Sequence, residues 1–468
     1  MATFVDPLRR AERVARRREA LVCGEVRLGY AEFLSRCRRL VSGLAELGTG
    51  RGDRVATLAA NSIPSVELYC ATSASGRVQV PLNTRWADAE LGYALEDSGA
   101  KVLFVDRDPG PLADVVERVV RLDLAEYEDL LRAVAEGDFD ESLTSDDVAG
   151  LFYTGGTTGA SKGVVLTHGN LLANTYHTQM LMPLEAEDCY LVQAPLFHAA
   201  GSNSLLQCIG LGARQVILEA FDPGAFLDLV EREGATATLG VPTMLAATVD
   251  EELARPRDVS SLALYGHGAS PVAIEVLRRA TEAFPATHFV HLYGATETAP
   301  LLTGLRHEER LLGGERQKSC GQPVIGVEVV VRAPDGTACK DGEPGEVTAR
   351  GANIMAGYWN KPAQTEAALR DGWYWTGDIG RLDEDGYLFL LDRSKDMIVS
   401  GGENVYCTEV EDALYAHPMV LEASVFGVPD ERWGEAVHAV VVPRGPVTAD
   451  ELISHCRGRI AGYKVPRT

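Results

Sequence analysis

The sequence lacks the features that would place the protein in a membrane or in an oxidising compartment. Its nine cysteines are dispersed, with no CxxC pair and no histidine–cysteine cluster at zinc spacing, so free thiols are favoured over disulfides or a zinc site. No apolar run is long enough to span a bilayer, and the N-terminus has no signal-peptide core. We therefore expect a cytoplasmic protein without integral membrane association.

Positive charge is also scarce. The chain has 44 Lys and Arg against 67 Asp and Glu, a formal net charge of −23, which argues against general nucleic-acid binding. The basic segment Arg9 to Ala20 is the exception. It could touch an anionic membrane surface, but a solvated helix face is the favoured interpretation. Any phosphate site must then be local, built from backbone N–H groups and a few cations.

Length and composition predict more than one domain. The 468 residues exceed one ordinary core, and 46% hydrophobic with 24% charged residues is globular composition. Between residues 214 and 294, four strand-like runs alternate with three helical patterns. Asp222 and Ser270 are the predicted N-caps of two of these helices, each followed by Pro. The alternation predicts a parallel sheet covered by helices on both faces.

The pattern changes after about residue 320. Dense Gly, Pro and Asp turns between short strands predict a small antiparallel, barrel-like or meander subdomain, and a compact α+β segment follows. We place the domain boundary at Asp392. The predicted class is α/β: a large N-terminal domain, residues 1–391, of parallel α/β sheets with a β-barrel-like subdomain, and a small α+β C-terminal domain, residues 392–468.

A glycine-rich loop, YTGGTTGASKG at residues 153–163, follows the apolar run VAGLF. Glycines let backbone N–H groups turn toward an anion, and Lys162 adds a mobile positive charge. The loop also carries the hydroxyls of Thr154, Thr157, Thr158 and Ser161. It is not a Walker A loop, because Gly163 follows the lysine. A flexible surface hairpin is the alternative, but three threonines in a glycine loop are not ordinary turn chemistry. We predict a phosphate site.

Two further stretches carry polar groups suited to a nucleotide. In HLYGATET, Tyr293 could stack on a purine, Thr296 donate to a phosphate and Glu297 hold Mg²⁺, which prefers oxygen ligands. Alone this stretch is a weak signal, and Tyr293 could be a core residue. In WYWTGDIGRL, Asp378 lies in a glycine-flanked turn, where its carboxylate could accept both hydroxyls of a ribose. A run from 391 to 414 adds Arg393 and a glycine pair before a helix.

In this order the motifs resemble those of the adenylate-forming enzyme superfamily, which includes acyl-CoA synthetases, peptide-synthetase adenylation domains and luciferases. The resemblance covers nearly the whole chain, and YTGGTTG, PLFH and LDRSKDMIVSGGENV are most similar to the acyl-CoA synthetase branch. It implies ATP, Mg²⁺ and coenzyme A as cofactors and a small carboxylic acid, fatty or aromatic, as substrate. The acid would form an acyl-adenylate with release of pyrophosphate, and CoA would then displace AMP. A homodimer is possible at the family level.

The resemblance also implies roles for individual residues. The ATP phosphate loop would comprise Thr154, Gly155, Gly156, Thr157, Thr158, Gly159 and Lys162. Adenine contacts would come from Gly268, Ala269, Ser270 and Tyr293, and Gly294 would be a further cofactor-binding residue. Thr296 would contact a phosphate, Glu297 would be the Mg²⁺ ligand, and Asp378 and Arg393 would contact the ribose. His198 would lie near the acyl carboxylate, its alternative being a satisfied core histidine. The catalytic set is then Thr154, Lys162, His198, Glu297 and Arg393.

The second half-reaction is assigned to the C-terminal domain by the same resemblance. Asp392 matches a hinge about which this mobile domain rotates. Gly401 and Gly402 match a loop that lines the pantetheine tunnel. Trp433 and Lys464 are candidate contacts for the CoA nucleotide, although Trp433 could equally be core.

The sequence departs from the family pattern at the phosphate loop and at its end. Gly155 stands where the family more often has Ser, and Ala160 where it more often has Pro. The sequence stops at Thr468, before the Gly-Lys turn that carries the family's catalytic lysine, and Lys464 is not its equivalent. We expect a truncated chain rather than a protein that forms adenylate poorly.

The sequence defines the acyl substrate less closely than the nucleotide. The stretches expected to line the acyl pocket are small to medium and mostly apolar, and no Asp suited to an α-amine is evident. Two alternatives stay open. The protein could be a biosynthetic adenylating enzyme that passes its acyl group to a carrier-protein thiol or another nucleophile, or a catalytically weak nucleotide-binding homologue.

Overall fold

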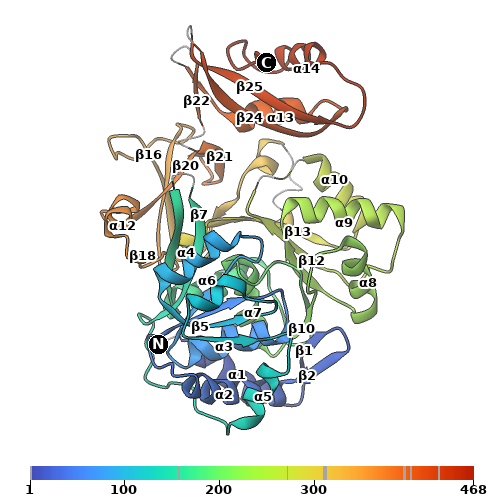
Figure 1. The fold of residues 1–468 in the computed structure, drawn as a ribbon. Helices are drawn as coiled ribbons and strands as arrows, with labels where there is room; N and C mark the ends of the chain where they lie inside the picture. Colours follow the sequence, from blue (N-terminus) through green and yellow to red (C-terminus); the bar gives the residue numbers. More distant parts are fainter. Residues whose placement is uncertain are drawn as a thin grey trace.

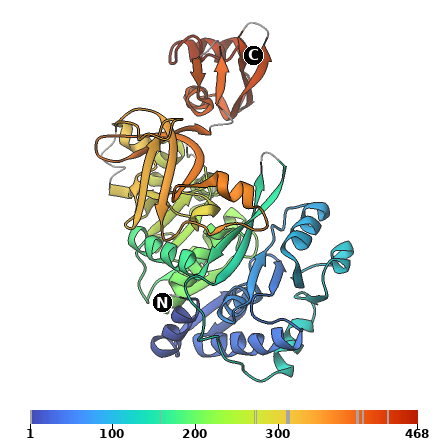
Figure 2. The ribbon, with the colours of Figure 1, turned by 90° about the vertical axis from the view of Figure 1, so that its left-hand side faces the viewer.

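The computed structural model describes residues 3–156, 159–270, 272, 274–308, 314–393, 397–400, 403–430 and 433–468. Within these residues the strands form four sheets. Two of them build the body of the molecule, a third lies beside them, and the fourth belongs to a small unit at one end that contains the C-terminus (Figure 1). The turned view shows the same separation between this unit and the body (Figure 2).

The first body sheet has the strand order β18-β8-β7-β4-β3-β5-β6. Its strands are β3 (Arg54–Leu58), β4 (Val78–Pro81), β5 (Ala100–Val105), β6 (Arg118–Arg121), β7 (Val148–Gly156), β8 (Gly159–Thr167) and β18 (Gly357–Tyr358). Strands β3 to β7 are parallel, whereas β8 returns antiparallel to β7 and β18 pairs with β8. Its connections contain α2 (Tyr30–Glu46), α3 (Ile63–Ala74), α4 (Asp88–Ser98), η1 (Gly110–Asp114) and α5 (Glu126–Ala133).

The second body sheet has the order β15-β14-β13-β12-β11-β9-β10-β1-β2. Its strands are β1 (Glu19–Cys23), β2 (Val26–Gly29), β9 (Cys189–Val192), β10 (Arg214–Ile217), β11 (Ala237–Gly240), β12 (Leu264–Gly268), β13 (His288–Tyr293), β14 (Thr303–Leu305) and β15 (Gln322–Pro323). The six from β13 across to β1 are parallel, and β2, β14 and β15 are antiparallel to their neighbours. The associated helices are α1 (Val5–Val14), α6 (His168–Leu181), α7 (Ala199–Leu211), α8 (Pro223–Glu233), α9 (Pro242–Ala254), α10 (Ile274–Ala283) and η2 (Thr296–Thr298).

The strand–helix alternation predicted between residues 214 and 294 is confirmed. Asp222 caps α8 as predicted, because its carboxylate accepts a hydrogen bond from the Ala225 N–H at 2.8 Å. The second predicted cap is wrong. Helix α10 begins at Ile274, four positions beyond Ser270, and Val272 is not helical. Ala269, just before Ser270, is in the left-handed region at φ 70°. The chain therefore bends away from the strand before the helix starts.

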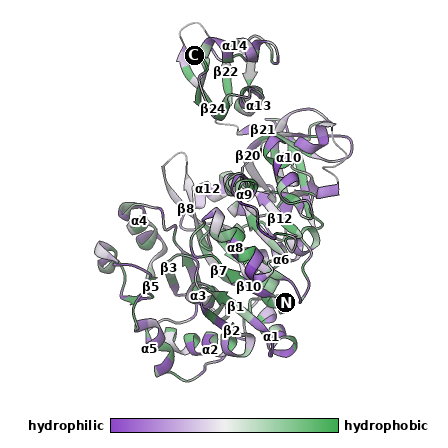
Figure 3. Ribbon diagram, turned by 90° about the vertical axis from the view of Figure 1, so that its right-hand side faces the viewer, coloured by the Kyte–Doolittle hydropathy of each residue, from purple (hydrophilic) through white to green (hydrophobic). Residues whose placement is uncertain are grey.

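Both body sheets are covered on both faces, and they share one core. Phe152 of the first sheet and Ile217 of the second belong to the same buried cluster, together with side chains of α6 and α7. Separate clusters pack α8, α9 and α10 on the outer face of the second sheet and α4 on that of the first. Figure 3 shows the hydrophobic colouring concentrated on central strands such as β7, with mixed faces on the peripheral helices.

Asn61 ties the two body sheets together at their carboxyl-terminal edges. It follows β3, and its amide nitrogen donates to the carbonyls of Ala194 at 3.1 Å and Leu218 at 3.2 Å. Its amide oxygen accepts from the Leu196 N–H at 2.9 Å. Because Asn61 is buried, these bonds hold the ends of β3, β9 and β10 in a fixed relation.

Apart from β15 and β18, which join the body sheets, the strands after residue 320 form the remaining two sheets. The third is antiparallel, as predicted, and comprises β16 (Val327–Arg332), β17 (Gly345–Gly351), β19 (Leu369–Arg370), β20 (Trp373–Leu382) and β21 (Leu388–Arg393). The fourth comprises β22 (Ile398–Ser400), β23 (Glu403–Val405), β24 (Val420–Asp430) and β25 (Gly434–Pro443). The accompanying helices are η3 (Gly314–Lys318), α12 (Pro362–Ala368), α13 (Cys407–Tyr415) and α14 (Ala449–Arg457).

Asp392 lies next to the end of β21, at the connection to the fourth sheet. Its carboxylate accepts from the Cys407 N–H at 2.5 Å, at the start of α13, and Thr408 donates to the carbonyl of Leu391. Its role as a hinge, and the domain boundary there, remain predictions. In the described ranges, each helix is too short or too polar to cross a bilayer.

Candidate active site

The predicted site residues follow the carboxyl ends of parallel strands. His198 follows β9 as the N-cap of α7, Ala269 follows β12, and Tyr293 ends β13, with Glu297 in η2 just beyond. Lys162 lies on the hairpin formed by the end of β7 and the start of β8. The carboxyl ends of parallel strands meet at one edge of a sheet, which is where open α/β sheets bind ligands. The topology thus brings most of the candidates to one region.

The glycine-rich loop is the tip of an antiparallel hairpin. In the register of β7 and β8, Thr154 lies opposite Lys162 and Gly156 opposite Gly159. Thr157 and Thr158, which were predicted to contact phosphate, lie outside the described residues. Gly155 is exposed, and a Cβ built on it would meet no atom within 4 Å. The loop therefore joins two antiparallel strands, with Lys162 on the returning strand β8. Its role as a phosphate site stays a prediction.

Lys162 and Glu297 both contact Tyr358, which the sequence analysis did not identify. The Lys162 ammonium lies 4.9 Å from the centroid of the Tyr358 ring, and the Tyr358 hydroxyl donates to Oε1 of Glu297 at 2.8 Å. Burial, together with the charge of Glu297 and the hydrogen bond to it, raises the pKa of Tyr358. One aromatic residue thus connects the loop lysine to the predicted metal carboxylate.

Tyr293 and Asp378 form a second connection. The Tyr293 hydroxyl donates to Oδ2 of Asp378 at 2.6 Å, and burial and the Asp378 charge raise the pKa of Tyr293. On β20 and β21, Asp378 lies opposite Arg393 in the strand register; the Arg393 side chain is not among those described. Tyr293 and Glu297 are four residues apart on one segment, so a single short stretch of chain carries one residue of each connection.

Close backbone approaches explain the glycines of the predicted adenine-lining segment. A Cβ on Gly268 would lie 2.2 Å from the carbonyl oxygen of Leu292, and one on Gly294 would lie 1.9 Å from that of Pro300. Any side chain at either position would therefore displace backbone. Ser270 is exposed beside them, and Thr296 is half-buried at the start of η2.

His198 is not a core histidine. It is exposed, and its ring contacts that of Phe197 with centroids 4.5 Å apart. Partial desolvation by the surrounding protein, together with the positive charge of Arg85, lowers its pKa. The side chain is therefore a neutral hydrogen-bonding group at pH 7, accessible from solvent.

Glu297 suits a magnesium ion that arrives with a nucleotide. In the part of the chain that is described, no three His, Cys, Asp or Glu side chains come together as a metal cluster. Mg²⁺ keeps several waters and is commonly bound through one or two carboxylates plus substrate phosphates. Glu297 is a single half-buried carboxylate that Tyr358 connects to Lys162 of the glycine-rich loop, which is compatible with that pattern.

Two of the residues predicted to contact CoA, Lys464 and Trp433, contact other side chains of the C-terminal unit. The Lys464 ammonium donates to both carboxylate oxygens of Glu409, at 2.6 and 2.8 Å. The Arg467 guanidinium lies 4.5 Å from the Trp433 ring centroid, and Trp433 is half-buried. Gly401 and Gly402 lie outside the described residues. Their roles toward CoA remain predictions.

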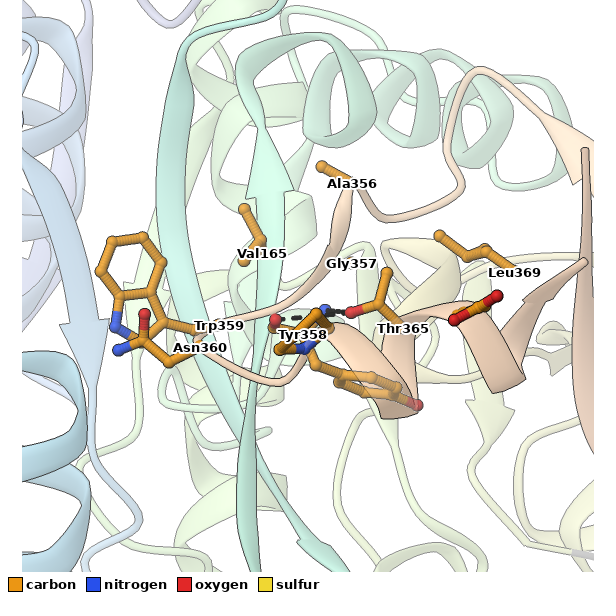
Figure 4. A pocket seen from close by; sticks show the side chains of 10 residues that line it. Val165, Ala356, Gly357, Tyr358, Trp359, Asn360, Thr365 and Leu369 are labelled. Carbon is orange, nitrogen blue, oxygen red and sulfur yellow. Dashed lines mark hydrogen bonds between the residues drawn. The ribbon is translucent and has the colours of Figure 1, made fainter.

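A cavity of about 520 Å³ opens beside Tyr358 (Figure 4). It is lined by Val165, Ala356, Gly357, Tyr358, Trp359, Asn360, Pro362, Thr365, Glu366 and Leu369. None of these is a predicted site residue, and the lining offers no cation for a phosphate. In Figure 4, Trp359 points away from Tyr358, and its indole N–H donates to the carbonyl of Asp97 at 3.0 Å. Within the described part of the chain, the cavity therefore adjoins the candidate site through Tyr358 alone.

Comparisons with known proteins agree with this geometry. The AMP-binding enzyme family matches residues 8–359, and the AMP-binding enzyme C-terminal domain matches residues 409–468. A feruloyl-CoA synthase from Amycolatopsis sp is 41% identical over 467 residues, covering 99% of this chain and 93% of that protein. The o-succinylbenzoate CoA synthetase of Bacillus subtilis, solved in complex with its acyl-adenylate intermediate, superimposes with a TM-score of 0.90 at 32% identity, over 100% of this chain and 93% of that one.

A second structure of the Bacillus subtilis enzyme was solved in complex with ATP and a magnesium ion. It superimposes with a TM-score of 0.90 at 31% identity, over 100% of this chain and 95% of that one. The predicted resemblance is thereby confirmed: the chain belongs to the AMP-binding enzyme family, in the acyl-CoA synthetase branch of the adenylate-forming enzymes.

Proposed function

We propose that this protein is an AMP-forming acid–CoA ligase whose substrate is an aromatic carboxylic acid. The acid attacks the α-phosphorus of ATP and forms an acyl-adenylate with loss of pyrophosphate, and the CoA thiolate then displaces AMP. The observation that carries the proposal is a pair of connections, Lys162–Tyr358–Glu297 and Tyr293–Asp378, joined by the short segment 293–297. It provides, in one region, groups of the kinds that phosphate, Mg²⁺ and ribose require.

The first half-reaction must bring two anions together. Lys162 and the backbone N–H groups of the glycine loop offset the repulsion between the carboxylate and the phosphates and stabilise the charge that develops at phosphorus. Glu297 would hold Mg²⁺, which when bound neutralises phosphate charge as a Lewis acid. Tyr293 and Asp378 would fix the adenosine, so that the acid and the α-phosphate meet in a defined orientation.

The acid is assigned as aromatic on two grounds. A relative that is 41% identical across nearly the whole chain is a feruloyl-CoA synthase, and other relatives, at 33–35% identity, are 2-succinylbenzoate–CoA ligases. The stretches expected to line the acyl pocket are mostly apolar. Exposed, neutral His198 supplies a hydrogen bond near the carboxylate. We assign a hydroxycinnamate-type acid, such as ferulate, ahead of a fatty acid.

The alternative acceptors are less well supported. The relatives are CoA synthetases and ligases, which favours CoA over a carrier-protein thiol, and the intact phosphate, metal and ribose groups argue against a catalytically weak binder.

All nine cysteines are free thiols, which supports a reducing, cytoplasmic location. A homodimer remains a prediction at the family level.

A pyrophosphate-release assay tests the proposal. Ferulate and related hydroxycinnamates, substituted benzoates, medium-chain fatty acids and amino acids are supplied with MgATP, with and without CoA. We expect pyrophosphate with an aromatic acid and AMP plus acyl-CoA only when CoA is present, with both activities abolished by Lys162→Ala and Glu297→Gln. Release with none of these acids, or turnover that persists in both variants, would contradict the proposal.

A further inference from the structure

Tyr358 joins two groups of the proposed ATP site that carry opposite charges. Its hydroxyl donates to Oε1 of Glu297 at 2.8 Å, and its ring lies under the Lys162 ammonium, with the nitrogen 4.9 Å from the centroid. Both contacts use parts of the side chain that a smaller residue would lack. Tyrosine at this position therefore acts on the carboxylate and on the cation at once.

Tyr358 is itself held on a rigid backbone. Strand β18 pairs with β8, placing Tyr358 opposite Val164 on the returning strand of the phosphate hairpin. The Tyr358 N–H donates to Oγ1 of Thr365 at 2.9 Å, one of the bonds drawn in Figure 4. The Met355 N–H, three residues earlier, donates to the backbone carbonyl of Glu297 at 2.9 Å. The same short segment thus fixes the tyrosine, the hairpin and the backbone of Glu297 relative to one another.

The hydrogen bond is made to only one of the two carboxylate oxygens of Glu297. Among the described residues, Tyr358 is the side chain that bonds this carboxylate, through Oε1. Oε2 is left to act as a ligand. Outer hydrogen bonds of this kind orient metal-binding carboxylates and tune their affinity.

We propose that Tyr358 is a positioning residue for MgATP: its hydroxyl orients Glu297 for Mg²⁺, and its ring holds Lys162 toward the phosphates. The inference rests on the proposed function, since it takes Glu297 as the magnesium ligand. It assigns two separable effects to one side chain, a metal effect to the hydroxyl and a phosphate effect to the ring.

A purely structural role of Tyr358 would give a different experimental result. Buried tyrosine hydroxyls usually find an acceptor, and removing one lowers stability without changing the affinity for a metal. The test must therefore measure metal binding directly as well as activity and melting temperature.

The test compares Tyr358→Phe and Tyr358→Leu with the wild type. Tyr358→Phe keeps the ring, so we expect the Mg²⁺ concentration that half-saturates ATP–pyrophosphate exchange to rise about tenfold, at the low end of the range for lost outer-shell bonds. Mn²⁺ binding to the ATP complex, measured by electron paramagnetic resonance, should weaken by a similar factor. Affinity for ATP in EDTA should be unchanged in Tyr358→Phe and reduced several-fold in Tyr358→Leu, since only leucine removes the ring from Lys162.

Tyr127→Phe is the matched control. It removes another phenol–carboxylate hydrogen bond, from Tyr127 to Oε2 of Glu67 at 2.6 Å, in a buried cluster of the first body sheet. We expect it to leave the Mg²⁺ and Mn²⁺ dependence at wild-type values, even if it lowers the melting temperature.

Two outcomes separate this inference from the proposed function. A folded Tyr358→Phe protein with wild-type Mg²⁺ and Mn²⁺ dependence overturns the positioning role while exchange in the wild type, and its loss in Glu297→Gln, still supports the ligase. Absence of magnesium-dependent exchange in the wild type, or a Glu297→Gln variant with full activity, overturns both.

Discussion

Replacing Tyr293 by Phe removes one hydroxyl and leaves the aromatic ring in place. In the wild type that hydroxyl donates to Oδ2 of Asp378 at 2.6 Å, joining the end of β13 to β20. The ring is the part that would stack on adenine, and the carboxylate is the part that would accept the ribose hydroxyls. Tyr293→Phe therefore tests whether the anchoring of Asp378 contributes to nucleotide binding, independently of stacking.

The magnitude follows from the bond that is lost. A hydrogen bond to a charged group contributes about 1.5–3 kcal/mol. Tyr293 and Asp378 are only half-buried, so water partly replaces the hydroxyl, and about 1–2 kcal/mol should reach ATP binding. Since 1.4 kcal/mol is tenfold, the dissociation constant for ATP should rise about 5- to 30-fold.

A double-mutant cycle measured by isothermal titration calorimetry isolates the coupling. ATP is titrated into the wild type, Tyr293→Phe, Asp378→Ala and the double variant. If the hydroxyl acts through Asp378, the double variant binds ATP as weakly as Asp378→Ala alone. Additive losses, or wild-type affinity in Tyr293→Phe, would refute the reasoning. Tyr127→Phe again serves as the control that should leave ATP affinity unchanged.

Three further predictions concern other parts of the chain. Burial lowers the pKa of His168 from an ordinary 6.5 to about 4, so the folded protein keeps this imidazole neutral. The unfolded chain takes up the proton first as the pH falls, so the free energy of unfolding should decrease by about 3 kcal/mol between pH 6.5 and pH 4. The variant His168→Asn keeps an acceptor for the Phe4 N–H, because the amide oxygen can replace Nδ1. Denaturant unfolding at pH 7 and 4.5 should show that this variant loses less stability on acidification than the wild type. An equal loss would exclude His168 as the cause. Gly268→Ala should lower both melting temperature and ATP affinity, because the added Cβ would lie 2.2 Å from the Leu292 carbonyl oxygen; wild-type values for both would contradict that packing. Gly155→Ser should fold normally and bind ATP at least as tightly as the wild type, because no atom lies within 4 Å of the added Cβ; calorimetry showing weaker binding would count against free space at the loop.

The sequence by itself determined the local chemistry of the site. Thr154, Lys162, Glu297 and Asp378 were predicted from residue type and from the resemblance of the ordered motifs to a family, because a carboxylate in a turn is by itself a weak signal. The strand–helix alternation also followed from local periodicity. The cap at Asp222 was predictable since capping involves residues three positions apart, whereas the cap at Ser270 was wrong because Val272 is not helical and the helix begins only at Ile274.

Only the tertiary structure decided which of these groups act together. Tyr358 has no distinguishing neighbours in the sequence, and its importance arises because β18 pairs with β8 and so brings it to Lys162 and Glu297. Tyr293 and Asp378 are 85 residues apart, and their hydrogen bond exists only because the end of β13 in the second body sheet lies against β20 of the third sheet. Spacing along the chain determines what a residue can do locally; contacts between distant strands depend on how whole sheets pack, and no short stretch of sequence contains that information.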